Sequence, residues 1–456
     1  MGVDAVSVLK AAEQVLWGAP MMAAFLLTGA FFTVYLRAFY LRRPGMVLSQ
    51  TLGSLRASRR EGGVMNQFQA LCTALAASVG TGNIVGVALM LTLGGPGSVF
   101  WMWVAGILSL ATGFAENVLG VRYRRRAGDG SWRGGSMYYI AQGLGAPGLG
   151  KAYALCCAVA ALGMGCFVQS NSISAALRAQ FSVPAGVTAG VLCVLTAVVI
   201  LGGAARLGRV TERLVPAMVI AYTLCGLACL VLRARALPGV MAEILRCALS
   251  PRAAGGFGLF AALRQGVGCG VFSNEAGLGS SVMANAAAEH TTPAQQGLWS
   301  IFEIGVDTLL MCTITAFVIL TSGVGGGSDG AALTMQAFAA SLGDAGSFVV
   351  LISLVLFAFS TTLGWSHFGA VSAAYLFGEG AQPAFRVLFL FCVGAGCLVE
   401  TPLAWCLANV LNGLMSLPNL WALWHLRGMV RAEALTLKEA PAARSAASPR
   451  PGRWRG

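Results

Sequence analysis

The chain has 456 residues, of which 57% are hydrophobic and only 10% are charged, and its mean hydropathy is +0.75. Charged residues make up about a quarter of a soluble globular protein, so this composition excludes a soluble enzyme, a secreted disulfide-stabilised domain and a disordered protein. The formal net charge is +13, but the basic residues lie in short runs between apolar segments or near the C-terminus. Such runs determine membrane topology, and the chain lacks the continuous basic domain of a nucleic-acid-binding protein.

Uncharged apolar runs of bilayer-spanning length recur along the whole chain, which predicts an all-α polytopic membrane protein. A spanning helix needs about twenty residues, and by this criterion there are about eleven of them. The predicted helices are residues 17–36, 68–93, 99–121, 152–177, 185–201, 214–232, 257–288, 298–320, 348–376, 384–398 and 403–426.

The first predicted helix is not a signal peptide, because its arginine cluster follows the apolar stretch. Arg37, Arg42 and Arg43 form this cluster, and only Lys10 precedes the helix. The positive-inside rule therefore places the N-terminus outside and the C-terminus in the cytoplasm, in the cell (inner) membrane.

Most other arginines agree with this orientation, but the loop that contains Arg233, Arg235, Arg246 and Arg252 falls on the outer side. Within it, residues 239–249 are expected to form an interfacial amphipathic helix. A short re-entrant or interfacial helix is expected at 134–145, and residues 427–456 are expected to be a basic, disordered cytoplasmic tail.

Two predicted helices are interrupted by glycine in a similar manner. Val79-Gly80-Thr81-Gly82-Asn83 interrupts the second, and Val267-Gly268-Cys269-Gly270 followed by Phe272-Ser273-Asn274-Glu275-Ala276-Gly277 interrupts the seventh. The two segments start five predicted helices apart. Paired interruptions of this kind point to an inverted-repeat transporter with a binding site near the bilayer midplane.

A helix break within hydrocarbon is tolerated only where the freed backbone lines a cavity or is buried in protein. Exposed amides at the start of a half-helix suit a carboxylate, and freed carbonyls suit a small cation. The alternative is that the glycines only permit close helix packing.

Acidic residues at membrane depth each require a partner or a role, because an ionised group there costs about 2.5–3.5 kcal/mol. Glu116, Glu275, Glu303 and Asp307 lie within or at the edge of apolar segments. For Glu303 and Asp307 the alternatives are structural hydrogen bonding and cation or proton coupling. Glu275 lies in the second interruption, where we expect a coupling role.

Three further groups of polar or aromatic residues lie in apolar segments. The Ser360-Thr361-Thr362 run offers hydroxyl ligands for sodium, or hydrogen bonds back to its own helix. Trp365 either packs in the core or covers a ligand. Gln169 begins a run of four polar residues and is expected to contact a ligand.

Several ordered motifs resemble those of the alanine or glycine:cation symporter family. The resemblance runs from about residue 68 to residue 378. It rests on Val79-Gly80-Thr81-Gly82-Asn83-Ile84, Gly94-Gly95-Pro96-Gly97, Phe100-Trp101-Met102-Trp103, Gln169-Ser170-Asn171-Ser172-Ile173, Phe272-Ser273-Asn274-Glu275-Ala276-Gly277, Asp307-Thr308 and Phe357-Ala358-Phe359-Ser360-Thr361-Thr362-Leu363-Gly364-Trp365, with a weaker match at Asn412-Gly413-Leu414-Met415 and Pro418-Asn419-Leu420.

The resemblance implies a leucine-transporter-type fold, in which a five-plus-five inverted repeat has discontinuous first and sixth core helices. Here residues 1–67 would hold one extra helix and a cytoplasmic loop. The core would span 68–426, with repeats at about 68–235 and 257–426. Members of the family move small neutral amino acids with sodium or, in some cases, protons.

The resemblance also implies site residues. The substrate carboxylate would meet the amides of Thr81 and Gly82, with a pocket lined by Gln169, Phe272, Asn274 and Trp365. One sodium ion would bind Asn83 and Ser273, and another would bind the carbonyls of Ala76 and Val79 with the hydroxyls of Thr361 and Thr362. Glu275 and Asp307 are candidates for coupling.

Three positions depart from the family pattern. His367-Phe368-Gly369-Ala370 stands where a Tyr-Tyr-Gly-Glu-like stretch is usual, Asn409 replaces an Asp, and Ser136 replaces a Pro. The two missing acids leave open whether the coupling ion is sodium or a proton.

We therefore expect a secondary active transporter that couples alanine or glycine to sodium by alternating access and needs no cofactor. The alternatives are a proton-coupled amino-acid transporter and a transporter-like sensor that binds without uptake. A channel would need a continuous polar lining, which the sequence lacks. An intramembrane metalloenzyme would need closely spaced ligands, whereas His290, His367 and His425 are scattered and the 13 cysteines form no CxxC pair.

Overall fold

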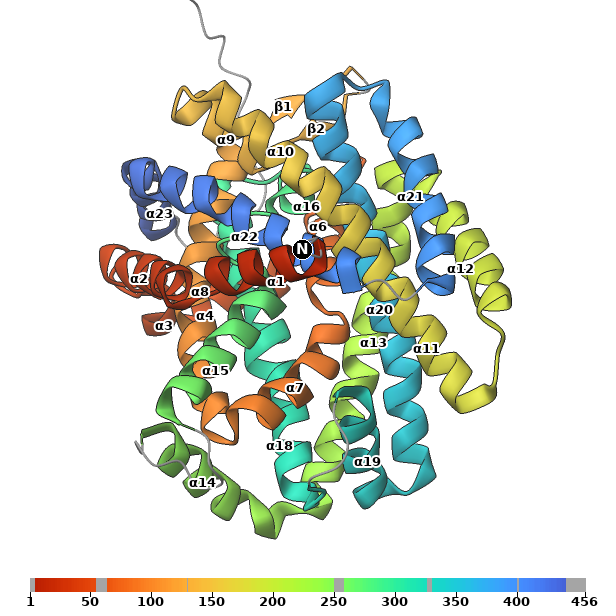
Figure 1. Cartoon of the computed structure of the whole chain (residues 1–456). Coiled ribbons are helices and arrows are strands. Elements are labelled where there is room, and N and C mark those ends of the chain that lie inside the picture. Colours follow the sequence, from red (N-terminus) through yellow and green to blue (C-terminus); the bar gives the residue numbers. More distant parts are fainter. Residues whose placement is uncertain are drawn as a thin grey trace, which may run out of the picture.

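The computed structural model of the chain describes residues 5–54, 64–128, 130–249, 258–325, 330–399 and 402–439. Within these ranges the protein is almost entirely helical (Figure 1). A two-stranded antiparallel ribbon pairs β1 (Arg125–Arg126) with β2 (Trp132–Arg133). It lies with α9 at one end of the molecule, and α14 lies at the opposite end. The predicted all-α membrane fold is therefore confirmed in its helical character.

The N-terminal segment forms two consecutive helices where one was predicted. Helix α1 (Ala5–Leu16) precedes α2 (Ala19–Tyr35), with Pro20 in the first turn of α2. Proline is tolerated there because the first amides of a helix have no partner within it. Three short helices follow, namely α3 (Phe39–Arg42), α4 (Pro44–Gln50) and η1 (Leu52–Ser54).

The first half of the core follows the predicted order of helices. It contains α6 (Gln67–Ser78), η2 (Thr81–Asn83), α7 (Val85–Gly94), α8 (Gly97–Arg122), α9 (Ser136–Gly143), α10 (Pro147–Leu162), the π-helical η3 (Gly163–Val168), α11 (Gln169–Phe181), α12 (Ala185–Ile200) and α13 (Gly203–Leu232). The helix expected within 134–145 is present as α9.

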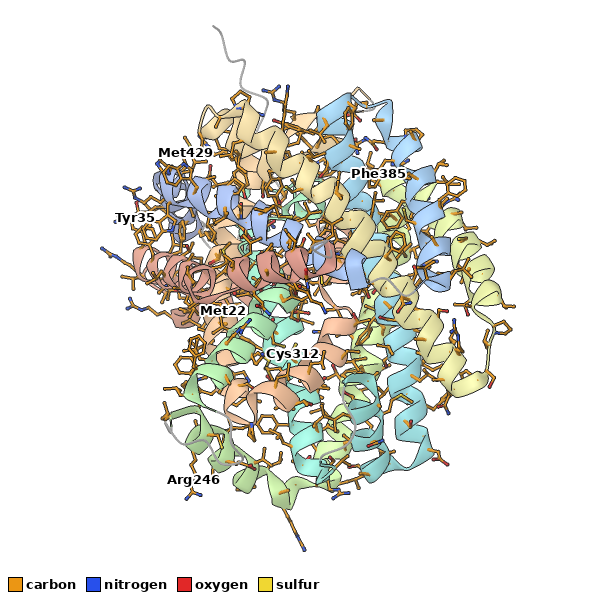
Figure 2. The ribbon with its side chains drawn as sticks, viewed as in Figure 1. Met22, Tyr35, Arg246, Cys312, Phe385 and Met429 are labelled. Carbon is orange, nitrogen blue, oxygen red and sulfur yellow. The ribbon has the colours of Figure 1, made fainter. Side chains whose placement is uncertain are left out.

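The second half contains η4 (Ala234–Ala236), α14 (Leu237–Leu249), α15 (Leu259–Asn274), α16 (Val282–Asn285), α17 (Pro293–Ile304), the π-helical η5 (Gly305–Cys312), α18 (Thr313–Ser322), α19 (Gly330–Leu342), α20 (Asp344–Phe377), α21 (Ala381–Leu398), α22 (Pro402–His425) and α23 (Arg427–Glu439). Helix α14 is amphipathic as expected. Val240 and Ile244 are buried, and Arg246 points away from the body of the protein (Figure 2).

Seven helical segments of the described residues are long and apolar enough to cross a membrane. They are Ser7–Tyr35, Gly97–Arg122, Pro147–Phe181, Gly203–Leu232, Pro293–Ser322, Asp344–Phe377 and Ala381–Leu398. Three of the other predicted spans are broken or shorter helices, and the fourth is the 24-residue α22, so the total of eleven and the inverted repeat stay predictions.

Two expectations need correction. Helix α15 runs without interruption through Gly268 and Gly270 and ends at Asn274, so the break lies wholly after the glycine pair. The start of the predicted disordered tail is also helical, as α23. Its Val430 is buried, and its Glu433 forms a salt bridge of 2.8 Å with Arg122 of α8. Residues 440–456 of the tail lie outside the described residues.

Glycines let α8 cross α15 at close range. A Cβ at Gly266 would collide with the carbonyl oxygen of Ser98 and would lie 2.8 Å from the Cβ of Trp101. A Cβ at Gly268, two residues further along the same helix, would lie 3.6 Å from Met22, which is ordinary van der Waals contact. Small residues at such crossings are the usual means by which membrane helices approach closely.

We predict that Gly266→Ala destabilises the protein by about 1–3 kcal/mol, because a backbone carbonyl cannot move aside as a side chain can. The measurement is the midpoint of thermal unfolding in detergent. Gly268→Ala is the matched control and should change the midpoint much less. Equal shifts for the two variants would contradict the close crossing of α8 and α15.

Candidate functional site

The first predicted helix break is present between α6 and α7. Helix α6 ends at Ser78, Val79 and Gly80 are extended, and a short turn at η2 leads into α7. A Cβ at Gly80 would lie 2.6 Å from Oγ1 of Thr361, so glycine is needed where the unwound chain passes α20. The side-chain oxygen of Asn83 accepts a hydrogen bond of 3.0 Å from the amide of Gly80 and so satisfies one freed donor.

The second break follows α15 and occupies residues 275–281. Glu275 ends the helix in a left-handed conformation (φ +56°), which is uncommon for any residue but glycine. Gly277 and Gly279 also have positive φ. The chain then resumes in α16 and reaches α17.

Polar side chains from four other helices hold this second break. Glu116 of α8 accepts a hydrogen bond of 2.9 Å from the amide of Gly277, and Asn419 of α22 donates to both Glu116 and the Gly277 carbonyl. The carbonyl oxygens of the break also accept from Ser136 and Tyr153, at 2.9 and 2.8 Å. Glu116 therefore has the structural role of satisfying freed backbone.

Glu303 also makes a structural hydrogen bond. Its carboxylate accepts a hydrogen bond of 3.1 Å from Asn285, which in turn accepts one of 2.8 Å from Gln296. This arrangement matches the structural alternative for Glu303.

Asp307 joins the first break to the end of α15, just before the second break. Its Oδ1 accepts a hydrogen bond of 2.8 Å from Asn83, and its Oδ2 accepts bonds of 2.6 and 2.9 Å from Ser273 and Thr308. All four residues are buried. The cluster of Asn83, Ser273, Asp307 and Thr308 is called here the Asp307 cluster. It brings together hydroxyl and carboxylate oxygens, which are hard ligands for a small cation, while Asn83 directs its amide nitrogen into the cluster.

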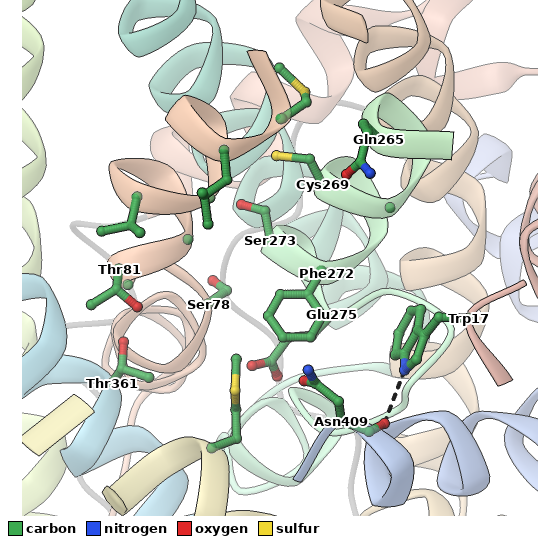
Figure 3. Close-up of a pocket in the computed structure, with 18 of the residues that line it drawn as sticks. Trp17, Ser78, Thr81, Gln265, Cys269, Phe272, Ser273, Glu275, Thr361 and Asn409 are labelled. Carbon is green, nitrogen blue, oxygen red and sulfur yellow. Dashed lines mark hydrogen bonds between the residues drawn. The ribbon is translucent and has the colours of Figure 1, made fainter. Parts of the chain in front are cut away.

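A cavity of about 430 Å³ lies beside both breaks (Figure 3). Of the predicted site residues, it is lined by Thr81, Gly82, Gln169, Phe272, Ser273, Glu275, Thr361 and Trp365. The predicted residues that do not line it are Ala76, Val79, Asn83, Asn274, Asp307 and Thr362. The side chain of Asn274 instead bonds to the backbone of the second break, where its Oδ1 accepts a hydrogen bond of 3.0 Å from the amide of Ala276.

Glu275 and Trp365 are coupled at the wall of this cavity. The indole nitrogen of Trp365 donates a hydrogen bond of 3.0 Å to Oε1 of Glu275, and Ser280 donates to the other carboxylate oxygen. Trp365 also packs so closely on η3 that a Cβ at Gly165 would collide with it. The ring is thus fixed in place at the edge of the cavity.

Three buried polar atoms at the cavity wall have no hydrogen-bond partner among the described residues. They are Oε1 of Gln169, Oγ of Ser78 and Oδ1 of Asn409. A buried acceptor or donor that stays unpaired costs about 1–3 kcal/mol. These atoms are therefore well placed to bind the polar groups of a ligand or water.

The residues that line the cavity but were not predicted as site residues include Glu13, Trp17, Ser78 and Asn409. Asn409 donates a hydrogen bond of 2.8 Å to Glu13, and its carbonyl accepts one of 3.0 Å from the indole of Trp17 (Figure 3). Trp17 also meets Phe272 edge-on, with ring centroids 5.9 Å apart. Ser78 adjoins the first break, which was a usable signal, whereas nothing in the sequence of α1 pointed to the cavity.

The second predicted sodium position is partly assembled. Oγ1 of Thr361 lies 3.4 Å from the carbonyl oxygen of Val79 and donates a hydrogen bond of 2.9 Å to Phe357 of its own helix. Thr362 donates to the carbonyl of Ala358, at 3.0 Å. Ala76 lies in the last turn of α6, and its side chain is fully buried.

Comparisons with known proteins identify the family. The sequence profile described as the sodium:alanine symporter family matches residues 3–446. An uncharacterised transporter of Haemophilus influenzae is 40% identical over 436 residues, covering 94% of this chain and 95% of that protein. A sodium/alanine symporter of Methanococcus maripaludis is 39% identical over 445 residues, covering 96% and 98%.

The fold is similar to the crystal structure of a manganese transporter from Eremococcus coleocola. The TM-score is 0.51 at 13% sequence identity, and the match covers 77% of this chain and 75% of that one. At this identity the likeness concerns the fold alone.

We predict that Asn83→Ala raises the sodium concentration needed to stabilise the protein at least tenfold. The substitution removes a predicted sodium ligand and one of the three donors to Asp307. The measurement is the rise of the thermal-unfolding midpoint with added sodium, relative to potassium, since a ligand that binds only the folded state stabilises it.

Asn117→Ala is the matched control. Asn117 is equally buried but donates to Gly113 of its own helix, at 3.0 Å, and does not line the cavity. An unchanged sodium titration for Asn83→Ala would remove Asn83 from the ion site.

Proposed function

The chain belongs to the sodium:alanine symporter family, and we propose that it carries a small neutral amino acid, alanine or glycine, across the membrane together with sodium. The observation that carries this proposal is the Asp307 cluster, which joins the two broken helices beside a cavity lined by polar groups that have no hydrogen-bond partner among the described residues. Multi-pass membrane transporters of this kind perform no covalent chemistry on their substrate.

The substrate carboxylate would meet the amides of Thr81 and Gly82, at the start of the half-helix that continues as α7. The positive end of the helix dipole favours an anion there. The ammonium group would bind the oxygens of Gln169 and Ser78, both at the cavity wall. Phe272 and Trp365 would enclose the side chain, and Asn274 would shape the pocket from behind.

Two sodium ions would bind next to the substrate. Asn83 and Ser273 would hold one, with Asp307 supplying the negative charge. The carbonyls of Ala76 and Val79 with Thr361 and Thr362 would hold the other. A cation at either position would offset the free-energy cost of removing these oxygen atoms from water.

Transport would follow alternating access, in which one bundle of helices moves against the other around this site. The core of residues 68–426 would consist of two inverted repeats, preceded by the helices of the N-terminal segment. In the orientation that the arginines favour, the N-terminus is outside the cell and the C-terminus is in the cytoplasm. The membrane potential then adds about 2.3 kcal/mol per charge for each 100 mV.

A proton-coupled transporter is the second candidate, and the buried carboxylates support it. Glu275 lines the cavity directly, and Asp307 joins the two broken helices. If one of these buried carboxylates gains and loses a proton during transport, the proton would replace sodium as the coupling ion. A third candidate is a sensor that binds the amino acid without carrying it.

The test is alanine uptake into proteoliposomes that contain the purified chain. We expect uptake with an inward sodium gradient and none when potassium replaces sodium. Uptake driven only by an inward proton gradient would establish the proton-coupled alternative. Alanine binding without uptake would overturn symport and establish the sensor.

We also predict that Trp365→Ala relaxes selectivity for side-chain size. The uptake of valine relative to alanine should rise at least tenfold, because each methylene in a tight apolar pocket is worth about 1–3 kcal/mol. Trp103→Ala is the control, since the indole of Trp103 donates a hydrogen bond to Thr313 and does not line the cavity. Unchanged selectivity in Trp365→Ala would show that this ring does not limit the pocket.

A further inference from the structure

A second cavity, of about 220 Å³, lies where helix α2 ends. Its walls come from the end of α2, from α3 and α4 and from α23. Figure 2 places Tyr35 of α2 and Met429 of α23 at the same edge of the protein. This cavity is separate from the substrate cavity, and the proposed transport function does not use it.

Among the described residues, three arginines and no carboxylate line the second cavity. Arg37 and Arg43 flank the short helix α3, and Arg431 comes from α23. In the described part of the chain, none of the three forms a salt bridge. Glu433 lies two residues from Arg431 on α23, but it is paired with Arg122 at 2.8 Å. Three like charges around one cavity repel one another, so an anion bound among them is stabilised.

The arginines are held by the local structure. The guanidinium group of Arg431 lies over the ring of Tyr35, at 5.2 Å from its centroid, which is a cation–π contact. Arg37 and Ala38 both have left-handed backbone angles, with φ of +59° and +46°. This turn ends the path of α2 and directs the chain into α3, which places Arg37 at the rim of the cavity.

The remaining wall of the second cavity is apolar. Leu36, Phe39 and Leu437 line it and are buried. The nearby outer surface is apolar as well, since Val34, Leu41 and Leu48 are 78%, 50% and 49% exposed. In a membrane protein, such exposed residues face the acyl chains. The second cavity therefore lies between a surface that faces acyl chains and a group of arginines, which is where lipid headgroups are found.

We propose that this cavity binds the phosphate group of an anionic phospholipid, whose acyl chains lie along the adjacent apolar surface. Guanidinium groups suit phosphate because they donate several hydrogen bonds in a fixed plane. Basic pockets between membrane helices bind anionic headgroups by this chemistry. The bound lipid would also join α23 to the turn after α2, so it would hold the C-terminal helix against the transporter.

The test is native mass spectrometry of the full chain, purified in detergent and mixed with phosphatidylglycerol or with phosphatidylcholine. We expect the wild-type protein to retain one phosphatidylglycerol under conditions that strip phosphatidylcholine. This comparison needs no variant. Equal retention of the two lipids would overturn the proposal.

Variants then locate the lipid. Each arginine near a membrane surface contributes roughly fivefold in binding, so Arg37→Gln with Arg431→Gln should weaken phosphatidylglycerol retention at least tenfold. Arg42→Gln is the matched control, because Arg42 is an exposed neighbour of Arg43 that does not line the cavity. A loss in Arg42→Gln as large as in the double variant would show a general effect of surface charge and overturn the site.

A final arm uses inorganic phosphate as the probe. The proposal expects phosphatidylglycerol to stay bound when millimolar phosphate is added, because the acyl chains add apolar contacts that the free anion lacks. Displacement of the lipid by millimolar phosphate would assign the cavity to a soluble anion and overturn the lipid proposal.

Discussion

Backbone groups that are released where a helix unwinds inside a membrane must find new hydrogen-bond partners, and the rest of this structure is arranged around that constraint. The first break uses a short local solution, in which Asn83 accepts from the amide of Gly80. The second break is longer and needs side chains from α8, α9, α10 and α22. These partners are themselves buried.

The two broken helices meet at Asp307. One carboxylate accepts from Asn83 of the first break and from Ser273 at the end of α15. A cation that enters this cluster would exchange hydrogen bonds for ligand bonds on both broken helices at once. Binding of an ion there would therefore be linked to the relative position of the two helices, as the proposed coupling requires.

Sequence reasoning identified the breaks well where residue type alone decides the backbone. The Gly-Thr-Gly-Asn run marked the first break correctly, since the extended Gly80 and the capping Asn83 compete with the helix. The sequence placed the start of the second break too early, because α15 continues through both glycines, and a Cβ at Gly270 would lie 3.1 Å from that of Ala105 in α8. The residue that turns the chain there is Glu275, whose left-handed angle has no signal in its residue type.

The rest of the site depends on contacts between distant segments. Asn83 and Asp307 are 224 positions apart, and Glu13 and Asn409 are 396 apart. No periodicity or spacing within one segment reports such pairs. The helical start of the C-terminal tail was missed for the same reason, because α23 packs against the distant helices α8 and α17.

The measurement that tests the central claim most directly is equilibrium binding of alanine to the purified protein over a range of sodium concentrations. If sodium and substrate share the site described here, alanine affinity rises with sodium, and sodium affinity rises with alanine by the same factor, as linkage requires. The same alanine affinity in sodium and in potassium would contradict the account.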